Sequence, residues 1–180
     1  PEPEPEPEVV AKDVHVAFRE VGAARERAQL LLHQLDTPHG GLPAQLPEEV
    51  KVLVAIILDA EAPLLKQAGD PLRKLLAEAF RSGSQQRIVV PVVDKAFRVE
   101  HFDGMPDDIR TLARQHLIVM DSAHPEQPIQ SIRESIQHAR DVRLSATLRG
   151  YLDTVVKDTE SFRDPCTQED VSTETQCVPL

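Results

Sequence analysis

The residues of this chain whose types and spacing could do chemistry are carboxylates and imidazoles between positions 100 and 116. Carboxylate oxygens are hard metal ligands and imidazole titrates near neutral pH, so such a set could bind a metal ion or transfer protons. An enzyme or ligand-binding site near residues 100–116 is therefore one hypothesis. The members of this cluster are Glu100, His101, Asp103, Asp107, Asp108 and His116.

A structural role accounts for this cluster and is the interpretation that we favour. Its spacing matches neither a HExxH zinc motif nor an EF-hand loop, and none of the seven histidines forms an i, i+4 pair. Asp107 and Asp108 fall where the first turn of a helix attracts acids. We therefore expect no catalytic residue, cofactor or metal; His101, Asp103 and His116 are the metal candidates to be tested against the structure.

The last four residues, from Cys177 to Leu180, fit the C-a-a-X pattern of prenylation. A lipid on Cys177 would make the chain a membrane-associated regulator. Pro179 at an aliphatic position and the lack of an upstream basic patch argue against it. Cys166 and Cys177 both lie in the tail, and no signal peptide opens the chain, so we expect reduced thiols and a cytoplasmic location.

The most regular apolar pattern of the chain lies in residues 9–35. Apolar side chains alternate there at spacings of four and three, which predicts one long helix packed lengthwise on another helix. That partner is either the last helix of the same chain or a second copy. The seam consists of Val10, Val14, Ala17, Val21, Ala24, Ala28, Leu31 and Leu35.

Further helices are predicted along the chain. Residues 50–66 are apolar nearly all round, which favours a central buried helix, with a strand as the rival. Asp70-Pro71 predicts an N-cap and first turn of a helix to about Phe80. Another helix is predicted over 109–120, and a long amphipathic one over 129–162.

Residues 87–102 are the stretch where a strand competes with a helix. The run from Arg87 to Val93 is rich in β-branched residues, so a small β-hairpin is one alternative, and Pro91 would confine it to a sheet edge. The other alternative is an extended segment followed by a helix. The pattern does not separate the two.

Composition supports a helical fold class. Hydrophobic residues make up 41% of the 180 residues and aromatic residues only 3%, so the core is aliphatic. We predict a mainly all-α protein, a helical bundle with two long amphipathic helices. Its predicted organisation is a Pro-Glu spacer at 1–8, a single domain at 9–163 and a disordered polar, acidic tail at 164–180.

The charge distribution excludes a nucleic-acid partner. Eight of the 30 acidic residues lie in the two tails, and all 20 basic residues lie between them, so the body is nearly neutral despite a net charge of −10. No basic stripe is left to contact phosphates. A membrane is an expected partner only if the chain is lipidated.

The leading functional hypothesis is a non-enzymatic helical interaction protein, that is, a scaffold, adaptor or assembly subunit. Heptad-like helices and a nearly neutral body suit coiled-coil packing with a protein partner or self-association into an oligomer. The lipidated regulator and the enzyme near residues 100–116 are the alternatives.

Overall fold

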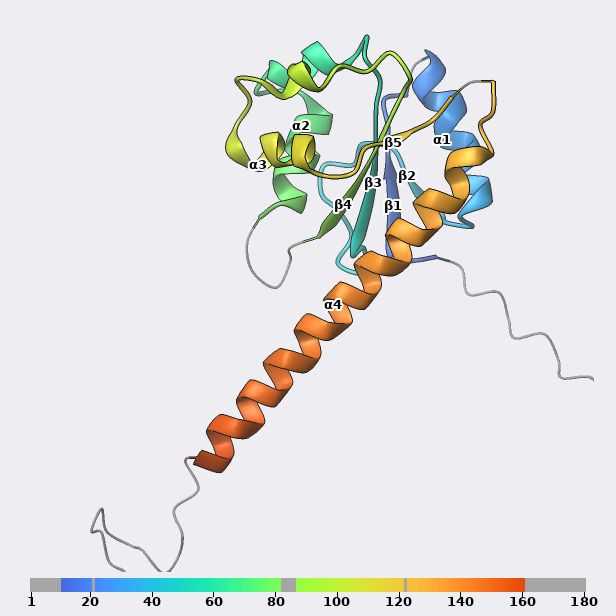
Figure 1. Cartoon of the computed structure of the whole chain (residues 1–180). Helices are drawn as coiled ribbons and strands as arrows, with labels where there is room; N and C mark the ends of the chain where they lie inside the picture. Colours follow the sequence, from blue (N-terminus) through green and yellow to red (C-terminus); the bar gives the residue numbers. More distant parts are fainter. Residues whose placement is uncertain (1–10, 21, 82–86, 122, 161–180) are drawn as a thin grey trace, which may run out of the picture. The chain divides into compact units, whose positions relative to one another are not determined.

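The structure is a computed structural model that describes residues 11–20, 22–81, 87–121 and 123–160. The chain divides into two units, residues 1–140 and 141–180, and each is described by itself. The first unit is built on a sheet of five parallel strands (Figure 1). The strands are β1 (Val14–Ala17), β2 (His39–Gly40), β3 (Val52–Ile57), β4 (Ile88–Val93) and β5 (Ile118–Val119).

Helices occupy most of the connections between these strands, because parallel neighbours need long crossover segments. The α-helices are α1 (Gly22–Gln34), α2 (Pro71–Ala79), α3 (Asp107–Arg110) and α4 (Gln127–Glu160). Short 3-10 helices cover Ala62–Lys66, Val99–Phe102 and Thr111–Arg114. Helix α4 follows β5; it begins in the first unit and ends in the second.

The strand order is β2-β1-β3-β4-β5, so the chain winds outward in both directions from the pair β1 and β3. Both β2 and β3 pair with β1 in parallel, one on each side. This is the topology of a doubly wound α/β sheet, whose winding direction reverses between β1 and β3. Ligands of such sheets usually bind at the carboxyl ends of the strands that flank the reversal.

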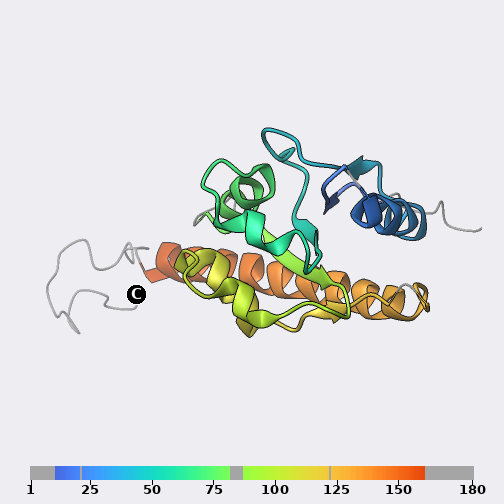
Figure 2. The same ribbon diagram turned by 90° about the horizontal axis from the view of Figure 1, so that it is seen from above.

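Helices cover both faces of the sheet. In Figure 1 α2 and α3 lie on one side of the strands and α1 on the other, and the view from above in Figure 2 also separates α1 from α2. The first core combines alternate strand residues with α1 and the first part of α4; its helical members are Ala24, Ala28, Leu31, Ile129, Ile132, Ile136 and Ala139. The second combines the opposite strand residues with Leu72, Leu75, Leu76, Ala79, Phe102, Ile109 and Leu112.

The prediction of an all-α helical bundle with coiled-coil packing is wrong, because the first unit is an α/β fold around a parallel sheet. Strand β3 shows the reason. All six of its residues are buried, with Val54 on one core and Leu53 on the other. A strand buried on both faces has no polar alternation, so its sequence resembles that of a buried helix. The predicted helix over 50–66 is this strand and the short 3-10 helix after it.

The predicted helix over 9–35 is also wrong in its first half. Val14 and Ala17 belong to β1, whereas Ala24, Ala28 and Leu31 are buried in α1 and Leu35 follows that helix, partly buried. Val14 shares the first core with the α1 residues, whereas Ala17 lies in the second core on the other face of the sheet, so the four-and-three spacing does not mark one continuous face. Gly22 separates the strand from the helix with φ +56°, a conformation that residues with a Cβ rarely adopt. Val10 and Val21 lie outside the described residues.

The segment 87–102 does not form the predicted hairpin; the alternative, an extended segment followed by a helix, is closer, because strand β4 is followed by the 3-10 helix Val99–Phe102. The first part of the segment is β4, an interior strand that pairs in parallel with β3 and β5. The backbone N–H of Ile88 donates to the carbonyl of Lys51, on the side of β3. Backbone N–H groups point alternately to the two sides of a strand, so position 91, where proline has no N–H, faces β5. The ladder to β5 begins only at Val92. Pro91 is therefore tolerated inside the sheet because it faces the unpaired stretch.

Two helix predictions are confirmed. Asp70 caps α2 by accepting the N–H of Arg73, with Pro71 in the first turn, and α4 spans nearly the predicted residues. The helix predicted over 109–120 is wrong: α3 is a single turn, and the chain then enters a 3-10 helix and β5. No helix in the described ranges is both long enough and apolar enough to cross a membrane.

Packing of α4 on the sheet predicts a large effect from one truncation. Ile132 is fully buried in the first core, so Ile132→Ala should lower the free energy of unfolding by about 2–5 kcal/mol. Val99→Ala, at a side chain that is 45% exposed, should change it by no more than about 0.5 kcal/mol. Urea denaturation followed by circular dichroism measures both. Equal effects would contradict this account of α4.

Candidate functional site

The loops after the carboxyl ends of β1, β3 and β4 bring together a network of charged side chains. We call it the carboxyl-edge cluster. Polar side chains collect there because the strands themselves are buried on both faces. The site also lies next to the reversal between β1 and β3, where doubly wound sheets bind ligands. Its members are Arg19, Asp59, Glu61, Asp70, Asp94 and His101.

The best-formed contact of the cluster is the ion pair of Arg19 and Asp70. Nη1 and Nη2 of Arg19 donate to the two carboxylate oxygens of Asp70 at 2.5 and 2.9 Å, and both residues are buried. Burial disfavours the charged carboxyl, but the hydrogen bonds from Arg19 and from the backbone of Arg73 hold the pKa of Asp70 below its ordinary value. The pair fixes the start of α2 to the end of β1.

Glu61 is less well satisfied. Its Oε2 lies 3.9 Å from Nε of Arg19, and each of these two buried atoms lacks a hydrogen-bond partner. Burial raises the pKa of Glu61; the negative charges of Asp94 and Asp70 act in the same direction, and Arg19 and Arg27 oppose them. The fold thus places a carboxylate where its charge is unfavourable.

His101 enters the cluster through Asp59. Its Nε2 donates to Oδ1 of Asp59 at 2.7 Å, and that hydrogen bond is the main reason why the pKa of Asp59 lies below its ordinary value. The backbone N–H of Asp59 in turn donates to Oδ1 of Asp94 at 3.0 Å. The ring of Phe97 lies 5.6 Å from the imidazole, centroid to centroid. The arrangement joins the loop after β3 to the loop after β4.

The other predicted metal candidates lie apart from this contact. Asp103 is exposed after the 3-10 helix Val99–Phe102, and His116 is exposed before β5. Within the described residues, no group of three or more His, Cys, Asp or Glu side chains could hold a metal ion. Sequence reasoning missed Asp59, although an acid directly after an apolar run would mark the carboxyl end of a strand.

A second feature of possible functional use is the apolar surface of α4 within residues 141–156. Ten large hydrophobic side chains are exposed in the described parts of the chain, and seven of them lie in this short stretch. They are Val142, Leu144, Leu148, Tyr151, Leu152, Val155 and Val156. Exposed apolar side chains concentrated on one helix mark an interaction surface.

Four of these side chains form what we call the apolar stripe. Leu144, Leu148, Tyr151 and Leu152 recur at spacings that place them on one side of a helix, and they are 54–66% exposed. Thr147 and Thr154 lie near the stripe, and their hydroxyls donate to backbone carbonyls one turn earlier in α4. The stripe therefore presents apolar area with polar neighbours that are already hydrogen-bonded.

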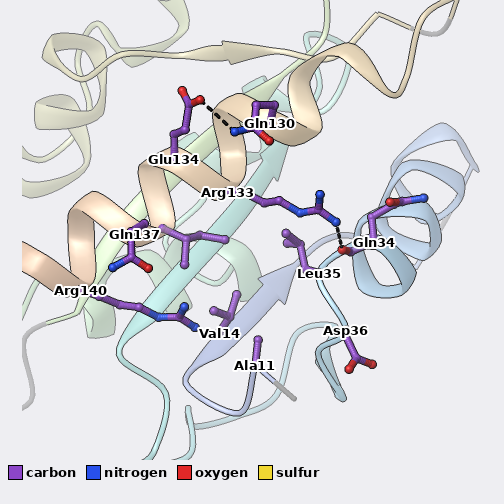
Figure 3. A pocket seen from close by; sticks show the side chains of 11 residues that line it. Ala11, Val14, Gln34, Leu35, Asp36, Gln130, Arg133, Glu134, Gln137 and Arg140 are labelled. Atoms are coloured by element: carbon purple, nitrogen blue, oxygen red, sulfur yellow. Dashed lines mark hydrogen bonds between the residues drawn. The ribbon is translucent and has the colours of Figure 1, made fainter. Parts of the chain in front are cut away.

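The first part of α4 borders a groove of about 540 Å³ with the end of α1 and the start of β1 (Figure 3). Arg133 donates to the carbonyl of Gln34 at 2.7 Å. Arg140 donates to both carboxylate oxygens of Asp13 at 2.8 and 2.6 Å, and these hydrogen bonds lower the pKa of Asp13. These contacts hold the first part of α4, within the first unit, against the end of α1 and the start of β1.

The comparisons with known proteins add no functional information. No protein family matches the chain, and no curated protein matches it. The candidate lipidation residue, Cys177, and both predicted tails lie outside the described residues.

Replacing Asp70 tests the buried ion pair. Asp70→Asn should lower the free energy of unfolding at neutral pH by about 3–5 kcal/mol, because the buried Arg19 loses its hydrogen-bonded counter-charge and keeps only the carboxylate of Glu61 at 3.9 Å. Since the pKa of Asp70 is lowered on folding, this stabilisation should fade as the pH falls through that lowered pKa. Asp107→Asn, at a side chain 88% exposed, is the matched control. Denaturant titrations of the three proteins over a pH series give the comparison.

Glu61→Gln should have the opposite effect on the free energy of unfolding and raise it at neutral pH. The pKa of Glu61 is raised on folding, so its contribution to stability is present at acidic pH and lost as the pH rises through the raised pKa. Glutamine keeps the shape without the charge, so the variant should be more stable than the wild type at neutral pH. The difference should shrink under acidic conditions. A variant that is less stable at neutral pH would show that the attraction to Arg19 outweighs burial.

Proposed function

We propose that this chain is a non-enzymatic assembly protein that self-associates through the apolar stripe of α4. The observation that carries the proposal is the concentration of exposed apolar side chains within residues 142–156. The strands β1 and β3, by contrast, have all their residues buried between the helices on the two faces of the sheet. The stripe is therefore the apolar surface that a second copy would cover.

The size of the stripe suits a reversible contact. Full burial of a leucine side chain contributes about 1.5–3 kcal/mol, and roughly half of that remains available where the side chain is half exposed. Association itself costs on the order of 4–15 kcal/mol in lost freedom. Pairing of two stripes doubles the apolar area removed from water, which favours a second copy of the chain as the partner.

The chemistry of the stripe also suits pairing with itself. Leu144, Leu148, Tyr151 and Leu152 carry no charge, so two stripes can approach without desolvating an ion or opposing like charges. The phenol of Tyr151 is 66% exposed and can keep its hydroxyl at the edge of an apolar contact.

The carboxyl-edge cluster supports a structural role instead. Asp70, Asp59 and Asp94 each accept hydrogen bonds from groups of the protein, and these bonds join loops that follow different strands. They account for the charges of Asp59, Asp70 and Asp94; Glu61 is the member of the cluster whose buried Oε2 keeps no hydrogen-bond partner.

Leu148→Glu combined with Leu152→Glu tests the proposal. Light scattering behind size exclusion, over a concentration series of the whole chain, should show a mass that rises toward a dimer for the wild type. The double variant should stay monomeric at each concentration, because carboxylates replace the centre of the stripe.

Ala146→Glu is the matched control for this experiment. Ala146 is exposed and lies two residues from both Leu144 and Leu148, so it faces away from the stripe on the same helix. This variant should associate like the wild type. A wild type that is monomeric throughout the series, or a double variant that still associates, would overturn the proposal.

A further inference from the structure

The edge strand β2 is only two residues long. It pairs with β1 through His15 opposite His39 and Val16 opposite Gly40. Around it, the N–H of Gly41 donates to the carbonyl of Val16 at 3.0 Å, and the hydroxyl of Thr37 donates to the carbonyl of Val14 at 2.6 Å. So short a ladder depends on each of its few contacts.

His15 supplies one of these contacts from a buried position. Its side chain is only 3% exposed, and Nε2 lies 2.9 Å from the carbonyl oxygen of Gly41. A carbonyl can only accept, so Nε2 carries the proton of the neutral ring. Nδ1 is then unprotonated; it is buried and has no hydrogen-bond partner.

Protonation of this ring is unfavourable while β2 is in place. A proton on Nδ1 would add a buried N–H without an acceptor and a buried positive charge. Burial accordingly lowers the pKa of His15; the hydrogen bond to Gly41 opposes this shift, and the charge of protonated His39 reinforces it.

The charged and titratable surroundings of His15 are contributed by three segments. From β2, the ring of His39 stacks on that of His15 at 6.4 Å between centroids. Before β3, a carboxylate oxygen of Glu49 lies 3.8 Å from Nε2 of His39. After β1, Oε1 of Glu20 lies 3.3 Å from where a Cβ on Gly41 would stand. The two carboxylates thus lie by His39 and Gly41 rather than at the unpartnered Nδ1.

We propose that His15 is a proton-sensitive latch, whose protonation releases residues 37–41 from β1. Release lets the charged ring reach water and leaves β1 as the edge of the sheet. An uncovered edge strand offers unpaired N–H and C=O groups to another strand. Because the ring is harder to protonate in the latched state, the latch holds at neutral pH and weakens as the pH falls below about 6.5, the ordinary histidine value.

Gly40 provides a way to open the same latch without titration. A Cβ at this position would lie 3.0 Å from both Cδ atoms of Leu32 and 3.2 Å from the ring of Phe18. The backbone of β2 is therefore packed directly against these two side chains. Gly40→Ala should loosen β2 at every pH.

The test is an NMR measurement on the whole chain between about pH 7.5 and about pH 5.5. In the wild type, the exchange protection of the Gly41 amide should be lost as the His15 ring becomes protonated, while amides of β3 keep theirs. His15→Gln retains an N–H donor for Gly41 but does not titrate, so its protection should not depend on pH. Gly40→Ala should show reduced protection throughout.

His39→Gln separates the two imidazoles. This variant should keep the pH dependence at Gly41, because His15 is unchanged. If His15→Gln does not fold, the latch is still tested in the wild type, where the pH at which the His15 ring becomes protonated is compared with the pH at which the Gly41 amide loses protection. The proposal is overturned if Gly41 loses protection while the ring of His15 is still neutral, or if the loss persists in His15→Gln.

Discussion

A parallel sheet covered on both faces is the constraint on which the rest of this structure depends. Parallel neighbours cannot be joined by tight turns, so each connection must cross over a face of the sheet. Here α1 and the first part of α4 cover one face, and α2 and α3 cover the other. Once both faces are buried, strand residues such as those of β3 must all be apolar. Charged side chains therefore lie mainly in the loops at the ends of the strands and along the edges of the sheet.

The carboxyl-edge cluster is the direct consequence of that constraint. Charged side chains excluded from the strands gather in the loops beyond them, where they fix one loop to another. Arg19 and Asp70 satisfy each other in two hydrogen bonds, whereas Glu61 keeps a buried oxygen without a partner. Burial makes well-paired groups strong tethers and leaves poorly paired ones as a source of instability. The same balance acts on His15 of β1, where the buried group is an imidazole rather than a carboxylate.

Helix α4 carries two different apolar surfaces in succession. Ile132 and Ile136 are buried against the sheet, and Arg140 is held by Asp13 near the end of that stretch. Beyond it, Leu148 and Leu152 are more than half exposed. One helix can therefore complete the core of the first unit and also offer a surface for assembly. The proposed function rests on this change of surroundings along a single element.

What the sequence by itself determined is local. The N-cap at Asp70 and the length of α4 follow from neighbouring residues, and they agree with the structure. The tertiary structure decided the rest. Residues 14–17 and 52–57 are strands of the sheet. Their sequence did not show this, because burial on both faces removes the alternation of apolar and polar residues that distinguishes a strand from a helix. The tertiary structure also gave His101 its partner Asp59, 42 residues away, because no local pattern encodes which loops a sheet will bring together.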